Sequence, residues 1–383
     1  MHPGSSAAKQ SGVFAIPKTM RAAVYRGPNN LCIETVPVPR ISPHELLVKV
    51  AVCGVCPTDI KKIQYGTVPP PRIFGHETAG TVVRVGYRAQ GFQIGERVAL
   101  HHHVPCLDCH ACRHHAFAQC ETYKRTGITA GFEPAGGGFA EYVRVMPFVL
   151  PGVVKIPARN SFEEGAMLEP VNTVLKAVKR LELLPDDNVL VAGQGPIGLM
   201  FTRILQLQGM NVLATDLMAE RLEISRKFGA KSAVKPETLS SNHGKPRPSS
   251  INHPQFTRLD AAVLAVPSDA ALKQALALVR GAGQVLLFAH TKRGSVTDLD
   301  LASICVDEKD LIGSYSADFT LQKEVARLVF SRKLDVRTLI SHRFDLENAV
   351  AAINLAAHPT PESFKIIVTP KGKETRISQI FLD

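Results

Sequence analysis

A glycine-rich turn between an apolar segment and a helical pattern constrains this chain most. Residues 189–192 are apolar and lead into the motif G-x-G-x-x-G, whose glycines are Gly193, Gly195 and Gly198. Glycine allows a sharp turn and a close approach to a ligand, and Pro196 suits a first helical position because no N–H is needed there. The free N–H groups of the helix start can then bind a pyrophosphate. The stretch predicts the strand, turn and helix of a dinucleotide-binding domain.

An acidic residue stands where such a domain needs one. A second apolar segment, 211–215, leads to Asp216, 18 residues beyond Gly198. A carboxylate there can hydrogen-bond the adenosine ribose and would repel a 2′-phosphate, which favours NAD over NADP. The predicted cofactor site includes Ile197 of the turn as well. The alternative is an ordinary glycine turn, but turn, helix and acid all fall where dinucleotide binding requires them.

Composition excludes several classes of protein. The chain has 383 residues, 45% of them apolar and 21% charged, which suits two globular domains. We find no run of eighteen apolar residues and no secretory signal at the start, so we expect a cytoplasmic protein without a membrane partner. The net charge is +11, but Lys and Arg are scattered, which favours solubility or attraction to an anionic dinucleotide over nucleic-acid binding.

Four of the eight cysteines lie within fifteen residues, with the spacing C-x2-C-x2-C-x7-C: Cys106, Cys109, Cys112 and Cys120. Without a secretion signal, this crowding favours a metal over disulfides. Four thiolates match the tetrahedral shell of a structural zinc. The six neighbouring histidines are expected to be exposed loop residues, the alternative being that one of them joins a metal site: His101, His102, His103, His110, His114 and His115.

The predicted elements change character along the chain. Short strands precede any long helix and indicate a β-rich first domain; they are expected at 20–36, 46–52, 81–86, 95–100, 136–145 and 148–156. Ser161 and Glu164 fit a capping box at the start of one helix, and a second helix is expected at 172–183. Strands and helices then alternate at 188–193, 196–208, 211–216, 219–228, 232–235, 259–266, 268–280, 284–290 and 310–315. A helix near 319–332 and strands at 341–345 and 364–368 follow, whereas 236–258 reads as a long loop.

Taken together, the motifs resemble those of a known family. They are Cys56-Pro-Thr58-Asp59, Gly75-His76-Glu77, the four cysteines, Met167-Leu-Glu169-Pro170 and the glycine turn. Over residues 20–370 the chain resembles the medium-chain zinc-dependent alcohol dehydrogenases, in the branch of sorbitol and L-threonine dehydrogenases.

The resemblance implies an α/β protein with a GroES-like β-rich catalytic domain and a Rossmann domain, a doubly wound parallel sheet, with the active site between them. The expected organisation is an N-terminal extension, 1–19; a catalytic domain, 20–165, with a zinc lobe, 101–122; a Rossmann domain, 166–315; and a segment completing the catalytic domain, 316–383.

The resemblance also implies one catalytic and one structural zinc per chain. Cys56 and His76 would bind the catalytic ion, with Glu77 and Glu169 on the ion or just outside it. Asp59 would accept a hydrogen bond from His76 and so fix its tautomer.

Thr58 resembles the hydroxyl that takes the substrate proton, and Arg221 a position over the adenine ribose. The chain departs from the branch in two places. Ile60, Lys61 and Lys62 stand where a proton-relaying histidine is common, and 236–258 replaces what is often a helix.

The implied reaction is hydride transfer between NAD and a small alcohol, preferably a polyol or hydroxy amino compound, in a homodimer or homotetramer. Two alternatives stay open. One is a zinc-containing reductase of activated carbonyls, and the other is a non-catalytic sensor of nucleotide and zinc. The presence of Cys56, His76 and Thr58 speaks against the sensor.

Overall fold

The computed structural model describes residues 15–101, 104–126, 136–239, 253–289 and 294–370. The chain divides into two compact units, and each is described by itself. The first contains residues 1–166, 343–357 and 366–377, and the second contains 167–342, 358–365 and 378–383. The domain boundaries expected from the sequence stay a prediction.

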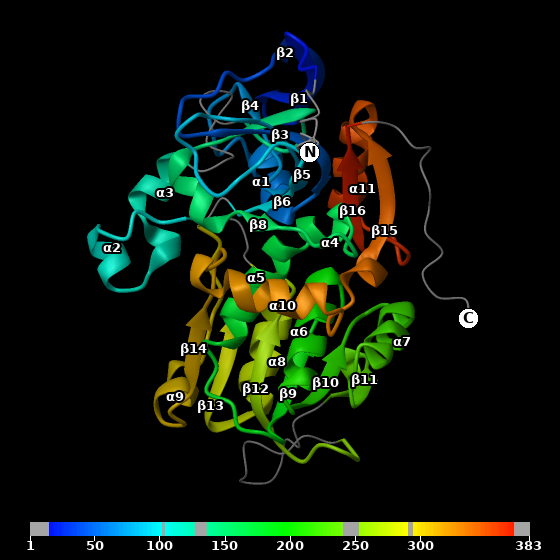
Figure 1. Ribbon diagram of the computed structural model, residues 1–383. Coiled ribbons are helices and arrows are strands. Elements are labelled where there is room, and N and C mark those ends of the chain that lie inside the picture. The colour runs from blue at the N-terminus through cyan, green and yellow to red at the C-terminus, as the bar shows by residue number, and fades with distance from the viewer. Residues whose placement is uncertain (1–14, 102–103, 127–135, 240–252, 290–293, 371–383) are drawn as a thin grey trace, which may run out of the picture. The chain divides into compact units, whose positions relative to one another are not determined.

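The first unit is rich in β-structure, as the sequence predicts (Figure 1). A three-stranded sheet has the order β2-β1-β4, from β1 (Thr19–Gly27), β2 (Asn30–Pro37) and β4 (Arg72–Ile73). A larger sheet has the order β15-β16-β3-β5-β6-β8, with β7 paired to β3. Its strands are β3 (Leu46–Gly54), β5 (Glu77–Val85), β6 (Arg97–Leu100), β7 (Tyr142–Val145), β8 (Val154–Lys155), β15 (Ile340–Asp345) and β16 (Lys365–Thr369).

One predicted strand of this unit is wrong over most of its length. The segment 148–156 is expected to be β-structure, but Pro147–Gly152 forms the 3-10 helix η2, and only Val154–Lys155 is a strand. Pro151 has no N–H to donate to a sheet, and Pro147 suits the first turn of a helix.

Helices of the first unit are short. They are α1 (Pro57–Tyr65), α2 (His110–Arg113), η1 (Phe117–Gln119), α3 (Glu121–Thr126), α4 (Phe162–Ala166), η6 (Leu346–Asn348) and α11 (Ala349–Ala357). The predicted capping box at α4 is confirmed, since the Glu164 N–H donates to Ser161 Oγ at 3.1 Å and the Ser161 N–H donates to Glu164 Oε2 at 2.7 Å. Helix α1 carries Thr58 and Asp59 and was not expected from the sequence.

The second unit is a Rossmann domain. Its sheet contains β9 (Asn188–Ala192), β10 (Asn211–Thr215), β11 (Ser232–Val234), β12 (Leu259–Leu264), β13 (Val279–Leu287) and β14 (Asp310–Gly313). All pairs are parallel, in the order β11-β10-β9-β12-β13-β14 (Figure 1). Numbered from β9, this is the order 3-2-1-4-5-6 of a doubly wound dinucleotide-binding sheet. The predicted fold class is confirmed.

The helices of this unit are α5 (Leu168–Val178), α6 (Pro196–Leu207), α7 (Ala219–Lys227), α8 (Asp269–Leu278), α9 (Leu301–Cys305) and α10 (Gln322–Phe330), with 3-10 helices η3 (Pro236–Thr238), η4 (Phe319–Leu321) and η5 (Val336–Leu339). Helix α5 begins earlier than expected, so Glu169 and Pro170 lie in its first turn, where proline costs no hydrogen bond. Of the predicted loop 236–258, residues 240–252 lie outside the described residues.

Among the residues that the structure describes, none of the helices is both long and apolar enough to cross a membrane.

Candidate active site

The three glycines of the turn after β9 are required for different reasons. Gly193 has φ +90°, which side chains rarely adopt, and a Cβ on Gly198 would overlap the carbonyl oxygen of Gly193. The protein itself therefore requires glycine at both positions. A Cβ on Gly195 would meet only Arg221 Nη1, at 3.9 Å. Since Gly195 is the N-cap of α6, the surface stays open at this helix N-terminus, as the binding of a pyrophosphate there would require.

Asp216 lies directly after β10 and is 8% exposed. Its Oδ2 accepts the Gln194 N–H at 2.6 Å, and its Oδ1 accepts the Met218 N–H at 2.9 Å. Each oxygen accepts one backbone hydrogen bond, so each keeps acceptor capacity for a ribose hydroxyl. The same carboxylate thus holds the glycine turn and offers a ligand contact.

Arg221 of α7 lies against this carboxylate. Its Nη1 is 4.0 Å from Asp216 Oδ2, and its Nη2 donates to the Ser363 carbonyl at 3.4 Å. The guanidinium also lies 5.7 Å from the centre of the Phe364 ring. Ser363 and Phe364 are more than 140 residues away in the sequence, so no motif could have indicated this contact.

Gln194 is a residue of this site that sequence reasoning missed. Its side chain is fully buried, donates through Nε2 to the Val191 carbonyl and accepts the Thr202 hydroxyl, both at 2.9 Å. These bonds tie the middle of the turn to the end of β9 and to the second turn of α6. The only sequence signal was a long polar residue between two glycines.

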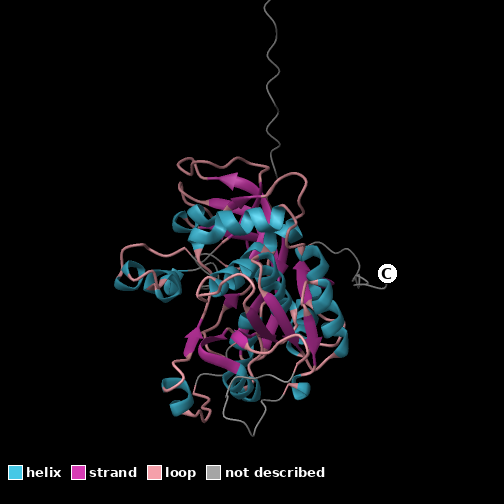
Figure 2. Cartoon of the chain, turned by 90° about the horizontal axis from the view of Figure 1, so that it is seen from below, coloured by secondary structure: helices cyan, strands magenta, loops and turns pink. Residues whose placement is uncertain are grey.

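The four cysteines predicted to bind zinc come together. They lie on or next to the short helices α2 and η1, which form a lobe with α3 (Figures 1 and 2). Their sulfur atoms lie within 4.8 Å of one another, with 3.5 Å between those of Cys109 and Cys112 and 3.9 Å between those of Cys106 and Cys112. A disulfide needs about 2.05 Å. Zinc–sulfur bonds of about 2.3 Å in a tetrahedron place sulfur atoms roughly 3.8 Å apart, so the donor set fits a closed zinc site.

The electrostatics of the lobe agree with a cation among the thiols. Hydrogen bonds from the backbone of Asp108 and Cys109 lower the pKa of Cys106 to about 6. Burial and the neighbouring Cys109 thiol raise the pKa of Cys112 to about 12. Because thiolates so close together repel one another, full ionisation of the set needs a metal ion.

A second group of metal-ligand residues lies in the first unit. Single ligand atoms of Cys56, His76 and Glu77 lie within 4.8 Å of one another. Cys56 is the N-cap of α1, whereas His76 and Glu77 lie where β5 begins. His76 is 5% exposed and Glu77 is 1% exposed. Thiolate, imidazole and carboxylate are all ligands that zinc accepts, so the residues fit that ion.

Asp59 supports this group from the first turn of α1. Its fully buried carboxylate has Oδ1 3.1 Å from His76 Nδ1, and Oδ2 has no hydrogen-bond partner among the described residues. Burial lowers the pKa of His76, but the charges of Asp59 and Cys56 outweigh burial and raise it well above its usual value. The group thus favours a positive charge next to the imidazole, which a metal ion supplies.

The remaining predicted residues divide between the units. Thr58 lies beside Asp59 on α1 and is half-buried. Glu169 is buried in α5 of the second unit, and its place at a metal stays a prediction. His110, His114 and His115 are exposed as expected, whereas His102 and His103 lie outside the described residues. The expectation that His101 is exposed is wrong, because it directly follows β6 and is fully buried.

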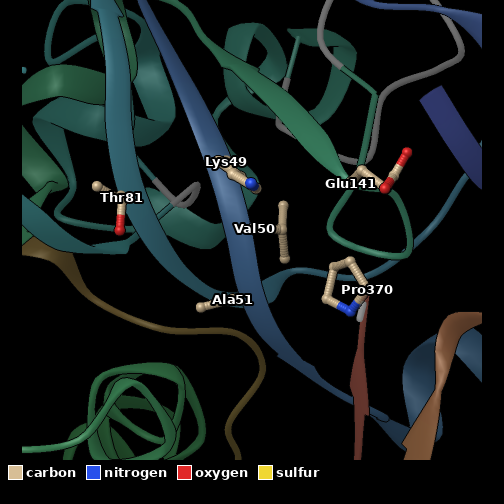
Figure 3. A pocket seen from close by; sticks show the side chains of 6 residues that line it. All are labelled: Lys49, Val50, Ala51, Thr81, Glu141 and Pro370. Carbon is tan, nitrogen blue, oxygen red and sulfur yellow. The ribbon is translucent and has the colours of Figure 1, made fainter. Parts of the chain in front are cut away.

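A cavity of about 250 Å³ opens elsewhere in the first unit. Figure 3 shows it against β3, with lining residues Lys49, Val50, Ala51, Thr81, Glu141 and Pro370. None of the predicted site residues lines it, and the Glu141 carboxylate already accepts the Arg21 N–H at 2.8 Å. The cavity is therefore not part of the candidate site.

Comparison with known families assigns both halves of the chain. Residues 42–158 match the family described as alcohol dehydrogenase GroES-like domain, and residues 196–331 match the family described as zinc-binding dehydrogenase. The first match covers α1, Cys56, His76 and the four cysteines. The second begins in the glycine turn.

Whole proteins agree with the family matches. Sorbitol dehydrogenase of Bacillus subtilis is 29% identical over 370 residues, which are 93% of this chain and 98% of that protein. Among solved structures, a zinc-binding dehydrogenase from Sinorhizobium meliloti bound to NADP has a TM-score of 0.80 and 25% identity, covering 92% of this chain and 100% of that one. An alcohol dehydrogenase from E. coli CFT073 complexed with NADH has a TM-score of 0.78 and 26% identity, with 92% and 100% covered.

Proposed function

This chain belongs to the medium-chain zinc-dependent alcohol dehydrogenase superfamily, and from that premise we propose that it transfers hydride between NAD and a polar secondary alcohol. The alcohol becomes a ketone, NAD becomes NADH, and one proton is released. The observation that carries the proposal is the grouping of Cys56, His76 and Glu77, with Asp59 behind the imidazole, in a chain whose other unit has the glycine turn of a Rossmann domain.

Cys56, His76 and a carboxylate from Glu77 or Glu169 would hold the catalytic zinc. Zinc in such a site acts as a Lewis acid that lowers the pKa of a bound hydroxyl. Asp59 Oδ1 accepts a hydrogen bond from the His76 Nδ1–H group. The other ring nitrogen, Nε2, is then the one that binds the metal. Thr58, next in sequence to Asp59, accepts the substrate proton. Because Ile60, Lys61 and Lys62 follow, the proton then leaves through water or a cofactor hydroxyl rather than a histidine.

Cys106, Cys109, Cys112 and Cys120 would hold the second, structural zinc. The spacing of their sulfur atoms supports this role. We assign the lobe, 101–122, to a catalytic domain of residues 20–165 that is completed by 316–383 and preceded by an extension, 1–19. The Rossmann domain in this assignment is 166–315.

The cofactor proposal is NAD, bound at Gly193, Gly195, Ile197 and Gly198, with Asp216 at the adenosine ribose. The free acceptor capacity of Asp216 supports a 2′-hydroxyl over a 2′-phosphate. Arg221, 4.0 Å from that carboxylate, tempers the preference because a guanidinium also binds phosphate. The two structural neighbours were solved with NADP and with NADH, so both cofactors occur on this fold.

The substrate proposed is a polyol or hydroxy amino compound. Among the relatives, the B. subtilis protein is a sorbitol dehydrogenase, and D-xylulose reductase A of Aspergillus oryzae is 26% identical. A site whose polar groups await a second hydroxyl discriminates against alcohols that lack it, because those groups are left unpaired. The chain contains no Trp, so no indole narrows the pocket to a small apolar slot.

Two finer points complete the proposal. We expect a homodimer or homotetramer, since the edge strand β14 and neighbouring α9 leave Leu301, Val306 and Leu311 exposed. We expect the enzyme to work in the cytoplasm, without nucleic-acid or membrane partners, because four thiols poised for metal suit a reducing compartment.

A substrate panel tests the proposal. NADH formation should be fastest, by kcat/KM, with sorbitol, threonine or other vicinal hydroxy compounds, and at least tenfold slower with ethanol, isopropanol and benzyl alcohol. Highest efficiency with the simple alcohols would contradict the substrate class. No turnover with any alcohol or ketone, in protein that holds two zinc ions per chain, would contradict the reaction itself.

A further inference from the structure

Helix α2 carries two histidines that the proposed reaction does not use. His110 is the first residue of α2 and His114 is its C-cap, so they lie four residues apart on one side of the turn. Their ring centres are 4.5 Å apart, with the ring planes at 49°. Both residues are exposed.

The two imidazoles are available to a ligand. Neither has a hydrogen-bond or ion-pair partner among the described residues. The nearest cation on the helix, Arg113, pairs with Asp108 at 3.3 Å, which offsets its charge. His115 takes another direction: it has φ +56° and packs edge-on against Phe117 at 5.8 Å.

We propose that His110 and His114 together bind one divalent transition-metal ion on the surface of the zinc lobe. Two histidines at i and i+4 of a helix can share one metal ion. With metal–nitrogen bonds of about 2.1 Å and a right-angled arrangement, the two ring centres of such a complex lie roughly 4.5 Å apart. The observed separation of the ring centres is 4.5 Å, which matches this spacing.

This ion is distinct from the zinc of the cysteine cluster. Four thiolates complete a tetrahedral shell and leave no position for an imidazole. The surface site offers two imidazoles at a right angle, and water completes the shell, which suits nickel or copper(II) rather than magnesium or calcium. An ion bridging His110 and His114 also braces α2, whose N-cap Cys109 and third residue Cys112 belong to the cysteine cluster.

Titration of the full-length, zinc-replete protein with Ni²⁺ by calorimetry tests the proposal. Wild type should bind Ni²⁺ at this site, and His110→Asn and His114→Asn should each weaken that binding at least tenfold. His115→Asn is the matched control on the same lobe and should bind as wild type does. His2, His102 and His103 are unchanged in every variant, so any Ni²⁺ that they bind contributes equally to all the titrations.

Each variant is first checked for two zinc ions per chain, and His110→Gln or His114→Gln replaces any variant that loses zinc. Unchanged Ni²⁺ affinity in the His110 and His114 variants would overturn the proposal. An equal loss in His115→Asn would also overturn it, because the pair would then not be the site. These measurements do not involve turnover, so they stand apart from the test of hydride transfer.

Discussion

The two groups of metal ligands in the first unit are built in opposite ways. The cysteine lobe has all its ligands within fifteen residues, from the loop before α2 to the residue before α3. Of its described residues from 106 to 123, only Cys112, Ala118 and Cys120 are buried, and two of these are themselves ligands. The Cys56 group instead joins α1 to β5, and the residues around it, Val55, Ile60, Ile73 and Phe74, lie in the main core of the unit.

The difference separates two roles of a metal. A lobe that buries so few apolar side chains depends on its ion for folding, because metal binding then supplies the folding free energy. The Cys56 group is held by packing that exists without an ion, so its metal is free to serve chemistry. Variants at the two groups should therefore fail in different ways.

The largest expected effect is on turnover at the Cys56 group. Cys56→Ser should lower kcat/KM at least about a thousandfold, since it removes a metal ligand, while the melting temperature changes by only a few degrees. Steady-state kinetics and thermal unfolding measure the two quantities. A melting temperature that falls as far as in Cys109→Ser would break the comparison.

The matching variant in the lobe should lose structure first. Cys109→Ser should reduce zinc from two ions per chain to one and raise hydrogen exchange over residues 106–122, because structural zinc contributes about 10 kcal/mol or more of folding free energy in small zinc domains. Metal analysis and exchange mass spectrometry check this. Protected lobe amides without the ion would show that the lobe has enough packing of its own.

The glycine turn allows the same separation in the second unit. Gly198→Ala should destabilise the domain by several kcal/mol, because its Cβ would overlap the Gly193 carbonyl oxygen. Gly195→Ala meets only Arg221 at 3.9 Å, so it should leave stability nearly unchanged and weaken NADH binding about tenfold or more. Unfolding curves and NADH fluorescence titrations decide it. Equal NADH affinity in Gly195→Ala would refute the assigned pyrophosphate position.

A smaller effect is expected on cofactor choice. Asp216→Ala removes the ribose contact and the repulsion of a 2′-phosphate, so the ratio of kcat/KM for NAD to that for NADP should fall about tenfold or more. Arg221→Ala is the matched variant and should raise the ratio. Better efficiency with NADP in the wild-type protein would contradict the predicted preference.

The smallest expected effect is on the stability of the first unit at acid pH, through the buried carboxylate of Glu45. Burial disfavours the charged form of Glu45, but hydrogen bonds from Arg144 and Ser42 outweigh burial and lower its pKa. Its stabilising contribution is therefore full above the unfolded pKa of about 4.3 and is lost as pH falls through the lower folded value.

Glu45→Gln should accordingly lower the melting temperature by a few degrees at pH 7, and the difference from wild type should shrink below about pH 4. Thermal unfolding across pH measures this. A constant difference at all pH values would show that shape, not charge, stabilises the pair.

Local interactions explain what the sequence determined. The strand–turn–helix of β9 and α6, the capping box of α4 and the cysteine spacing each depend on residues a few positions apart. Such features form from backbone conformation and near-neighbour hydrogen bonds, so a motif can specify them without knowledge of the rest of the chain.

Helix α1 is an element that the sequence patterns did not lead us to predict. Cys56-Pro-Thr-Asp has a proline at the first helical position and an acid in the first turn, which are helix-start signals, yet β-rich surroundings in the sequence obscured them.

Only the tertiary structure decided the contacts between distant segments. His76 meets Asp59 across 17 residues, and Arg221 meets Ser363 across 142. The first contact depends on how α1 packs in the first unit, and apolar burial in the core of that unit fixes this packing. A local pattern names the groups that can ligate, donate or carry charge. Their distances follow from long-range packing, because only the closed core holds such residues within hydrogen-bonding reach.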